Sequence, residues 1–162
     1  MHMEQSAYWE NVRAVLDKNR TTKFVSMKAL KKNVENISHY IKSGYEKVQN
    51  INENINSEAK QLCEWLSDNR YVFEENLFIV EKSLSKKKLL SGGKANKPIY
   101  YHAFCEFYKC FDGKLSEERI MEFCSVVMQE NQKPTYFDLY SFESIMRVVI
   151  LESVGDVCKK IC

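Results

Sequence analysis

The side chains most able to do chemistry lie in one stretch, LCEWLSDNRYVFEENLFIVEKSL, at residues 62–84. Its polar residues are Asp68, Asn69, Glu74, Glu75 and Asn76. Two carboxylates can act on a glycosidic bond when they stand about 5 to 10 Å apart across an open cleft. Glu74 and Glu75 are adjacent, and adjacent residues point to different faces of a helix. The sequence therefore predicts no catalytic pair here.

Asn69 and Asn76 indicate a structural role instead. They fall seven residues apart, on the same stripe as the apolar residues of this stretch. A buried amide must find hydrogen-bond partners, and backbone carbonyls at neighbouring helix ends are the simplest ones. We expect the polar residues of this stretch to anchor helices.

A second polar set lies near the C-terminus. Arg147 follows Glu143 by one helical turn, and it could also reach Glu152. An exposed pair of this kind contributes only about 0.2 to 0.5 kcal/mol to stability. If Arg147 is buried, we expect it to fix the last helix against the helix of residues 62–84.

Six cysteines raise the question of disulfides or a metal site: Cys63, Cys105, Cys110, Cys124, Cys158 and Cys162. Cys158 and Cys162, and less closely Cys105 and Cys110, lie near enough along a helix to share a metal ion. Zinc sites normally need four ligands, however, and the chain adds only three histidines. Most of the cysteines sit in helical apolar patterns, so we interpret them as reduced thiols packed as small hydrophobes. No metal or cofactor is expected.

The aromatic residues after Pro98 could stack on sugar rings. They recur at helical spacing: Tyr100, Tyr101, Phe104, Phe107, Tyr108 and Phe111. Aromatic residues at this spacing usually fill helical cores, so packing against residues 62–84 is the favoured interpretation. A glucan-binding pocket in an open bundle is the functional alternative.

Lysines gather in SKKKLLSGGKANK, residues 85–97, which we expect to be a flexible loop. The lysines at 86 to 88 favour the end of the preceding helix, and Gly92 and Gly93 interrupt the chain. The composition favours a solvated loop. Contact with anionic lipid headgroups is the alternative, since each exposed lysine adds about 1 kcal/mol near such a surface.

Helices must position all of these residues. The 162 residues include 5 Gly and 2 Pro, and 44% are apolar, which favours one domain of long helices with few turns. The periodicity predicts an all-α bundle of about six helices, in which the helix of residues 62–84 is unbroken and central. The others are expected at residues 5–17, 27–55 and 98–111, from Ser116 to the Gln-Lys-Pro at 132–134, and from Thr135 onward. Ser116, and Thr135 with Asp138, are predicted N-terminal caps.

A heptad pattern runs from Met27 to Ile55. Its members are Met27, Leu30, Val34, Ile37, Ile41, Gly44, Val48, Ile51 and Ile55. A regular heptad requires a partner helix along its seam. The pattern predicts a long helix in a helical hairpin, and the partner is either another helix of the chain or a second copy.

Charge and hydropathy narrow the choice of partners. The net charge is +2, with 24 basic and 22 acidic side chains mixed along the chain, so nucleic acid is not expected. The longest apolar run, at residues 148–151, is far shorter than the roughly 20 residues of a membrane span. The N-terminus lacks the pattern of a secretory signal, so we expect a cytoplasmic protein.

Two blocks of the sequence resemble the N-terminal region of the cyclic β-1,2-glucan synthases, large bacterial membrane glycosyltransferases. EWLSDNRYVFEEN, residues 64–76, is similar to the family's Trp-Leu pair, Asp-Asn pair and following acidic pair. FDGKLSEERIMEF, residues 111–123, and PTYFDLYSFESIMRVVILES, residues 134–153, are similar to its Asp-Gly turn and Thr-initiated helix. The resemblance covers residues 60–155. The chain departs from the family pattern at Arg70, Phe137, Tyr140 and Glu143.

The resemblance implies a parent enzyme that uses UDP-glucose and spans the inner membrane. The matched segment precedes the glycosyltransferase part, so no catalytic residue is carried over. We therefore expect residues 1–162 to be a single helical accessory domain of a larger protein. It would lie on the cytoplasmic side and position the catalytic parts, with the other domains as its partners. The alternative is a stand-alone helical interaction module that dimerises through the Met27–Ile55 seam.

Overall fold

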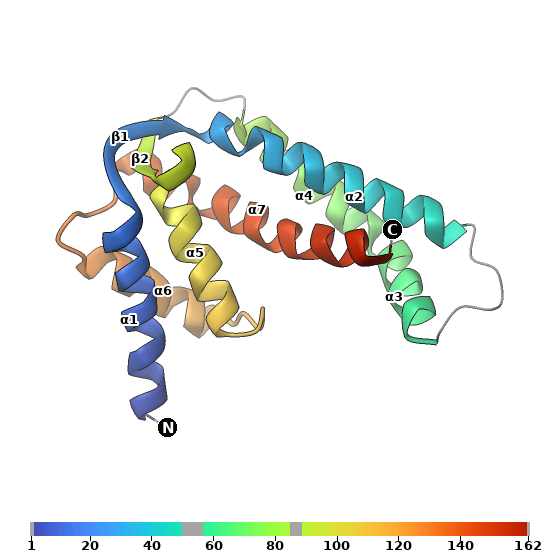
Figure 1. The fold of residues 1–162 in the computed structure, drawn as a ribbon, viewed down its shortest axis with the longest axis horizontal. Helices are drawn as coiled ribbons and strands as arrows, with labels where there is room; N and C mark the ends of the chain where they lie inside the picture. The colour runs from blue at the N-terminus through green and yellow to red at the C-terminus, as the bar shows by residue number, and fades with distance from the viewer. Residues whose placement is uncertain (1, 50–56, 85–88, 162) are drawn as a thin grey trace.

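The computed structural model describes residues 2–49, 57–84 and 89–161, which fold into seven α-helices and a two-stranded antiparallel sheet (Figure 1). The predicted all-α, multi-helix bundle is confirmed. The helices are α1 (His2–Asn19), α2 (Lys31–Gln49), α3 (Ser57–Asp68), α4 (Arg70–Leu84), α5 (Ile99–Cys110), α6 (Glu117–Gln129) and α7 (Tyr136–Ile161). The remaining elements are strands β1 (Arg20–Ser26) and β2 (Leu89–Gly93) and the 3-10 turns η1 (Met27–Leu30) and η2 (Lys94–Asn96).

Helices α1, α5 and α6 gather at one end of the molecule, which we call the aromatic end (Figure 1). The Phe107 ring of α5 is fully buried, 5.7 Å from the ring of Trp9 and 4.9 Å from that of Phe123. The Tyr100 ring lies 5.0 Å from that of Phe142 in α7. The aromatic residues of α5 therefore fill a core, as predicted. Their ring partners come from α1, α6 and α7 rather than from residues 62–84.

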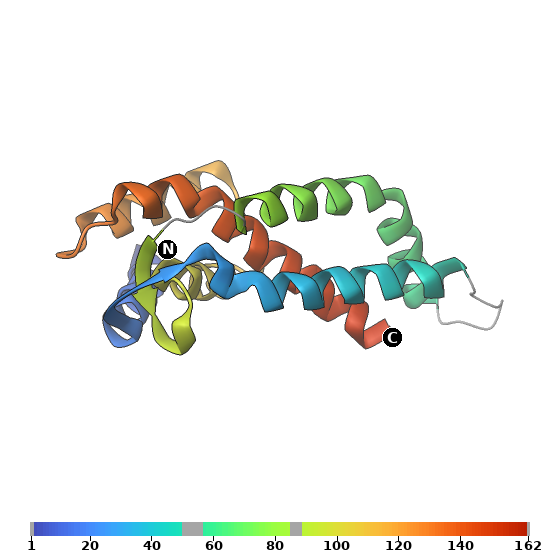
Figure 2. The same ribbon diagram turned by 90° about the horizontal axis from the view of Figure 1, so that it is seen from above.

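The other end, which we call the rod end, is built from α2, α3, α4 and the C-terminal part of α7 (Figures 1 and 2). Val34, Ile37 and Ile41 of the heptad seam are buried, and α7 runs along them. The two helices approach closely at Gly155, where an added Cβ would lie 3.5 Å from the Cα of Ile37. The described part of the seam thus has its partner helix inside the chain. The predicted homo-oligomer stays a prediction.

The single helix predicted for residues 62–84 is wrong, because the chain turns at Asn69. The Asn69 side chain donates to the carbonyl of Trp65 at 2.8 Å, and its own carbonyl accepts the N–H groups of Val72 and Phe73. Helices α3 and α4 therefore meet at one residue and diverge sharply (Figure 2). The expected central position is also wrong. Helix α7 packs against α2, α4 and α5, while Trp65 is 50% exposed.

The β1–β2 ribbon occupies two segments in which no helix or strand is predicted, and η1 replaces the first turn of a predicted helix. Residues 18–26 fall between two predicted helices, residues 85–97 form a predicted loop, and residue 27 starts a predicted helix. Phe24 instead pairs with Ser91 across the ribbon, and the Ser26 hydroxyl accepts the Lys28 N–H at the start of η1. Gly92 permits this pairing, because a Cβ there would lie 1.9 Å from the Lys23 carbonyl oxygen. The lysines at 86 to 88 and the seam positions 51 and 55 lie outside the described residues.

The predicted starts of the last two helices are confirmed. The Ser116 hydroxyl accepts the Arg119 N–H at 3.4 Å. The Thr135 hydroxyl accepts the Asp138 N–H at 3.2 Å, and the Asp138 carboxylate accepts the Thr135 N–H at 2.8 Å. These reciprocal bonds satisfy backbone donors that a helix start leaves unpaired.

Candidate functional site

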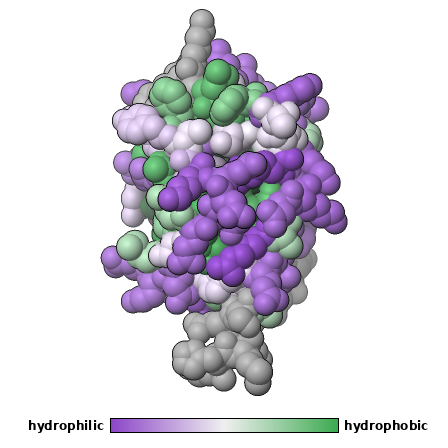
Figure 3. Space-filling view, turned by 90° about the vertical axis from the view of Figure 1, so that its left-hand side faces the viewer, coloured by the Kyte–Doolittle hydropathy of each residue, from purple (hydrophilic) through white to green (hydrophobic). Residues whose placement is uncertain are grey.

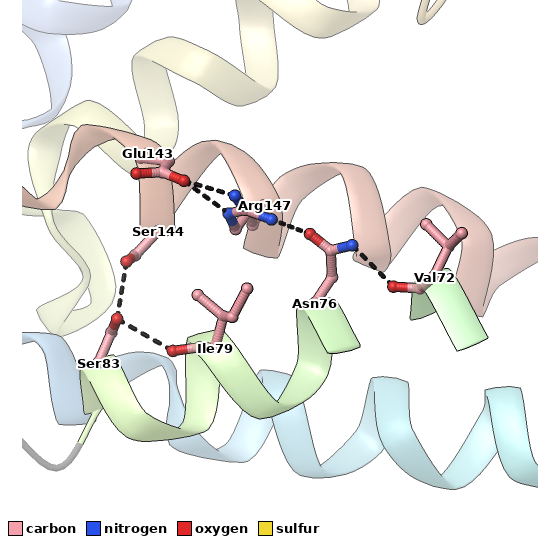
Figure 4. Close-up of polar contacts among 7 residues, drawn as sticks. All are labelled: Val72, Asn76, Ile79, Ser83, Glu143, Ser144 and Arg147. Atoms are coloured by element: carbon pink, nitrogen blue, oxygen red, sulfur yellow. Dashed lines mark hydrogen bonds and ion pairs between the residues drawn. The ribbon is translucent and has the colours of Figure 1, made fainter. Parts of the chain in front are cut away.

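Arg147 joins α7 to α4 through Asn76 (Figure 4). Its guanidinium donates to the Asn76 side-chain oxygen, and the Asn76 amide donates to the Val72 carbonyl at 2.7 Å. The same guanidinium pairs with Glu143 one turn earlier, with 3.1 Å between Nε and Oε1. Asn76 is thus satisfied on both sides of its amide, and the arginine sits between two helices rather than in a cleft.

A second link joins the same two helices about two turns further along α4 (Figure 4). The Ser144 hydroxyl of α7 donates to the Ser83 hydroxyl of α4 at 2.8 Å. Ser83 in turn donates to the Ile79 carbonyl at 3.1 Å. Helices α4 and α7 are therefore held at two points along their contact.

The other polar candidates of residues 62–84 do not join this link. Asn69 forms the turn between α3 and α4, and Glu74 pairs with Arg70 at 2.7 Å on the surface. Asp68 and Glu75 are exposed. The carboxylates thus belong to the surface of the rod end and do not converge on one point.

Glu152 joins α7 to α2 and α5 on another side of the helix. Its carboxylate accepts from the Asn33 amide at 2.6 Å and from the Tyr101 hydroxyl at 2.7 Å. The Lys97 ammonium donates to the Tyr101 hydroxyl at 3.2 Å and lies over the Tyr101 ring. Burial raises the pKa of Tyr101, so its hydroxyl remains a neutral donor. Glu152 thus forms its hydrogen bonds with α2 and α5 and not with Arg147.

Asp138 is a polar centre that the sequence reasoning treated only as a helix cap. It is fully buried, and it accepts the backbone N–H and the hydroxyl of Ser91 in β2 at 2.8 and 2.6 Å. The N–H and the hydroxyl of Thr135 each lie 2.8 Å from the same carboxylate. Asp138 therefore accepts from four donors. We call this group, Asp138 with Ser91 and Thr135, the Asp138 latch. It attaches the start of α7 to the ribbon.

The described cysteines are separate thiols. Cys105, Cys110 and Cys124 are partly buried and Cys158 is buried, and no disulfide joins these four described cysteines. Burial raises the pKa of Cys105 to about 11, which keeps it as an unreactive thiol. Among the residues that the structure describes, no three His, Cys, Asp or Glu side chains group so that they could hold a metal ion.

A groove of about 620 Å³ separates α5 from the C-terminal part of α7. Its floor includes Tyr108 and Val149, and its rims carry Lys109, Asp156 and Lys160. Its lining carries charges of both signs. This composition is typical of a solvated groove between helices, and it offers no single charge to a ligand.

No family model, no curated protein and no solved structure matches this chain. Within the described residues, no helix is long and apolar enough to cross a membrane.

Large apolar side chains remain exposed on the rod end, on α6, where they are Met121 and Met128, and along the ribbon with the start of α7. On the rod end, Trp65 of α3 is joined by Tyr71 and Phe78 of α4, and Tyr71 is 71% exposed. On the aromatic end, the exposed side chains follow the ribbon and the first turns of α7: Phe24, Leu89, Tyr136, Phe137, Leu139 and Tyr140. Contiguous exposed apolar surface marks contact sites for other molecules.

Proposed function

We propose that this chain is a non-catalytic helical accessory domain that positions the catalytic parts of a cyclic β-1,2-glucan synthase-like protein. One observation carries the proposal. Asn76 belongs to the first sequence block that resembles this family and Arg147 to the last, and the two side chains bond to each other. The resembling residues are therefore used to hold two helices in a fixed arrangement.

A rigid accessory domain acts by shape, so its polar residues should serve packing rather than chemistry. Arg147 and Glu152 both do so, since one bonds to α4 and the other to α2 and α5. The aromatic side chains of α5 likewise serve packing, because Phe104 and Phe107 are buried in the core. The domain would lie on the cytoplasmic side, with the other domains of the parent protein as its partners.

Sequencing the reading frame that contains these residues is the first test. The proposal expects membrane spans and a sugar-nucleotide glycosyltransferase segment downstream. A frame that encodes neither would overturn it.

The second test measures glucan synthesis from UDP-glucose by that longer protein. Asn76→Ala is expected to lower the rate by loosening the contact between α4 and α7. The matched control is Glu75→Gln, because Glu75 is exposed on the adjacent position and is expected to leave the rate unchanged. A rate abolished by Glu75→Gln and unaffected by Asn76→Ala would contradict a non-catalytic role.

A stand-alone self-association module is the second candidate, and the exposed Trp65, Tyr71 and Phe78 favour it. Sedimentation velocity over a wide range of concentration separates the two functions. The accessory role expects a monomer at every concentration. A dimer that is lost on changing Tyr71 and Phe78 to Ser would support self-association through the rod end.

A further inference from the structure

One face of the ribbon turns its apolar side chains toward the start of α7. Phe24 and Ser91 are cross-strand partners, so their side chains leave the ribbon on the same face. Ser91 reaches Asp138 of α7 on that face. Leu89, two residues before Ser91, lies on the same face by the alternation of a strand. Phe24 and Leu89 are each 59% exposed, so they flank the latch at the surface.

The first turns of α7 continue this apolar surface. The Tyr136 ring lies 5.8 Å from that of Phe137 and 6.3 Å from that of Tyr140, and Tyr136 is 73% exposed. We call the six exposed residues the apolar rim: Phe24, Leu89, Tyr136, Phe137, Leu139 and Tyr140. Figure 3 looks onto this end of the molecule, where hydrophobic side chains gather near the top and hydrophilic ones cross the middle. The Asp138 latch holds the two parts of the rim together.

The charge of the ribbon and its flanking turns is one-sided. Residues 20–30 and 89–98 contain no Asp or Glu, and their five basic residues are Arg20, Lys23, Lys28, Lys94 and Lys97. The nearby carboxylates have partners, since Glu130 pairs with Arg13 at 3.4 Å and Glu143 pairs with Arg147. The whole chain carries only +2, so the remainder is net acidic. The ribbon and its flanking turns are therefore basic segments of the chain.

We propose that the apolar rim and the basic ribbon dock onto a bilayer surface that contains anionic phospholipid. Tyrosines at membrane interfaces place the ring in the apolar boundary and the hydroxyl in the headgroup layer. Lysines beside them are attracted to anionic headgroups. The rim residues come from a helix start and a ribbon and are exposed, which suits a flat lipid surface.

Flotation of the purified chain with lipid vesicles tests the proposal. The chain is expected to float with vesicles of phosphatidylcholine and phosphatidylglycerol, and to stay behind with phosphatidylcholine alone. Added salt should weaken binding, because it screens the lysines. Lys23→Gln with Lys28→Gln is expected to lower the partition coefficient at least tenfold, since each lysine contributes about fivefold. Tyr136→Ser with Tyr140→Ser removes two of the six rim residues and is expected to lower the partition coefficient by a similar factor.

The matched control is Tyr71→Ser, which removes an equally exposed tyrosine from the rod end. It is expected to float like the unchanged chain. Circular dichroism of each variant checks that the helices are retained. Equal flotation on neutral and anionic vesicles, or no flotation at all, would overturn the proposal. A concentration-dependent dimer that the rim variant alone abolishes would assign the rim to a second copy, and would also overturn it.

Discussion

The aromatic end and the rod end hold their helices by different means. At the aromatic end, rings from α1, α5, α6 and α7 interlock around Phe107 and Phe123. At the rod end, aliphatic residues of α2 and α7 pack along a seam, and hydrogen bonds such as that from Arg147 to Asn76 join the helices. A few large contacts therefore carry the aromatic end, whereas many small ones are spread along the rod end.

The polar groups of the two ends differ in how deeply they are buried. Asp138 at the aromatic end is fully buried with four donors, while Arg147 and Glu143 at the rod end remain partly in contact with water. A buried polar group that loses its partners costs more than an exposed one, because water cannot replace them. Single changes should therefore be more damaging at the aromatic end.

Truncating Phe107 is the largest expected effect. Phe107→Ala removes a fully buried ring that contacts Trp9, Phe104, Phe111 and Phe123. It is expected to lower the free energy of unfolding by about 3 to 5 kcal/mol, because a cavity replaces the ring. Urea unfolding followed by circular dichroism measures the loss.

The control for this prediction is Phe78→Ala, which truncates the same residue type on the exposed face of α4. It is expected to change the free energy by no more than about 0.5 kcal/mol. Equal losses for the two variants would break the comparison between the two ends.

Replacing the latch carboxylate should have the next largest effect. Asp138→Asn keeps the volume, but its NH₂ group then faces the N–H and hydroxyl donors of Ser91 or Thr135. We expect a loss of about 1 to 3 kcal/mol in the free energy of unfolding, since buried donors lose their acceptor. Asp156→Asn, an exposed position in the same helix, is the control and should leave stability unchanged. A loss as small as that of the control would show that the latch does not hold α7.

The link at the rod end should be weaker. Asn76→Ala removes the acceptor of Arg147 and is expected to cost about 1 to 2 kcal/mol. A double-mutant cycle with Arg147→Met sharpens the prediction, because residues in contact show a coupling energy of at least about 0.5 kcal/mol. Additive losses would mean that the two side chains act independently.

The parts of the fold that the sequence predicts well depend on short-range patterns. Thr135 and Asp138 are three residues apart, so their reciprocal bonds could be expected from spacing alone. The turn at Asn69 could not, because the apolar stripe continues in register on both sides of it. The deciding contact is the bond from Asn69 to the Trp65 carbonyl, and an asparagine on a helix face gives no warning of it.

Long-range pairings were harder to predict. Phe24 and Ser91 lie in segments that are polar or rich in glycine and lysine, and neither predicts a strand without its partner. Asp138 could therefore be predicted as a cap but not as the latch to β2. The contact from Arg147 to α4 could be predicted, because Asn76 lies on the apolar stripe of its helix and a buried Arg147 would face that stripe. The contact from Glu152 to Asn33 depends on where α2 lies, which periodicity does not specify.

The smallest effect is expected at the junction of α2 with α4, where Tyr45 meets Arg70. The Tyr45 hydroxyl faces the Arg70 carbonyl at 3.5 Å, and the Arg70 guanidinium lies 5.2 Å from the ring centroid. Burial, aided by the charge of Glu74, raises the pKa of Tyr45 from 10.0 to about 12. The folded state therefore favours the neutral hydroxyl, while the unfolded chain releases its proton near pH 10. The stabilising contribution is fully present below pH 10 and is lost as the pH rises toward 12.

Tyr45→Phe cannot ionise, so its free energy of unfolding should fall less steeply between pH 10 and 12 than that of the unchanged chain. Urea unfolding at several pH values in this window gives the two slopes. Tyr71→Phe serves as the matched variant at the exposed end of α4, and a change common to both variants reflects only a lost hydroxyl. Parallel slopes for Tyr45→Phe and the unchanged chain would mean that the junction is open to water. The rod end would then be held by its seam and by the links between α4 and α7 alone.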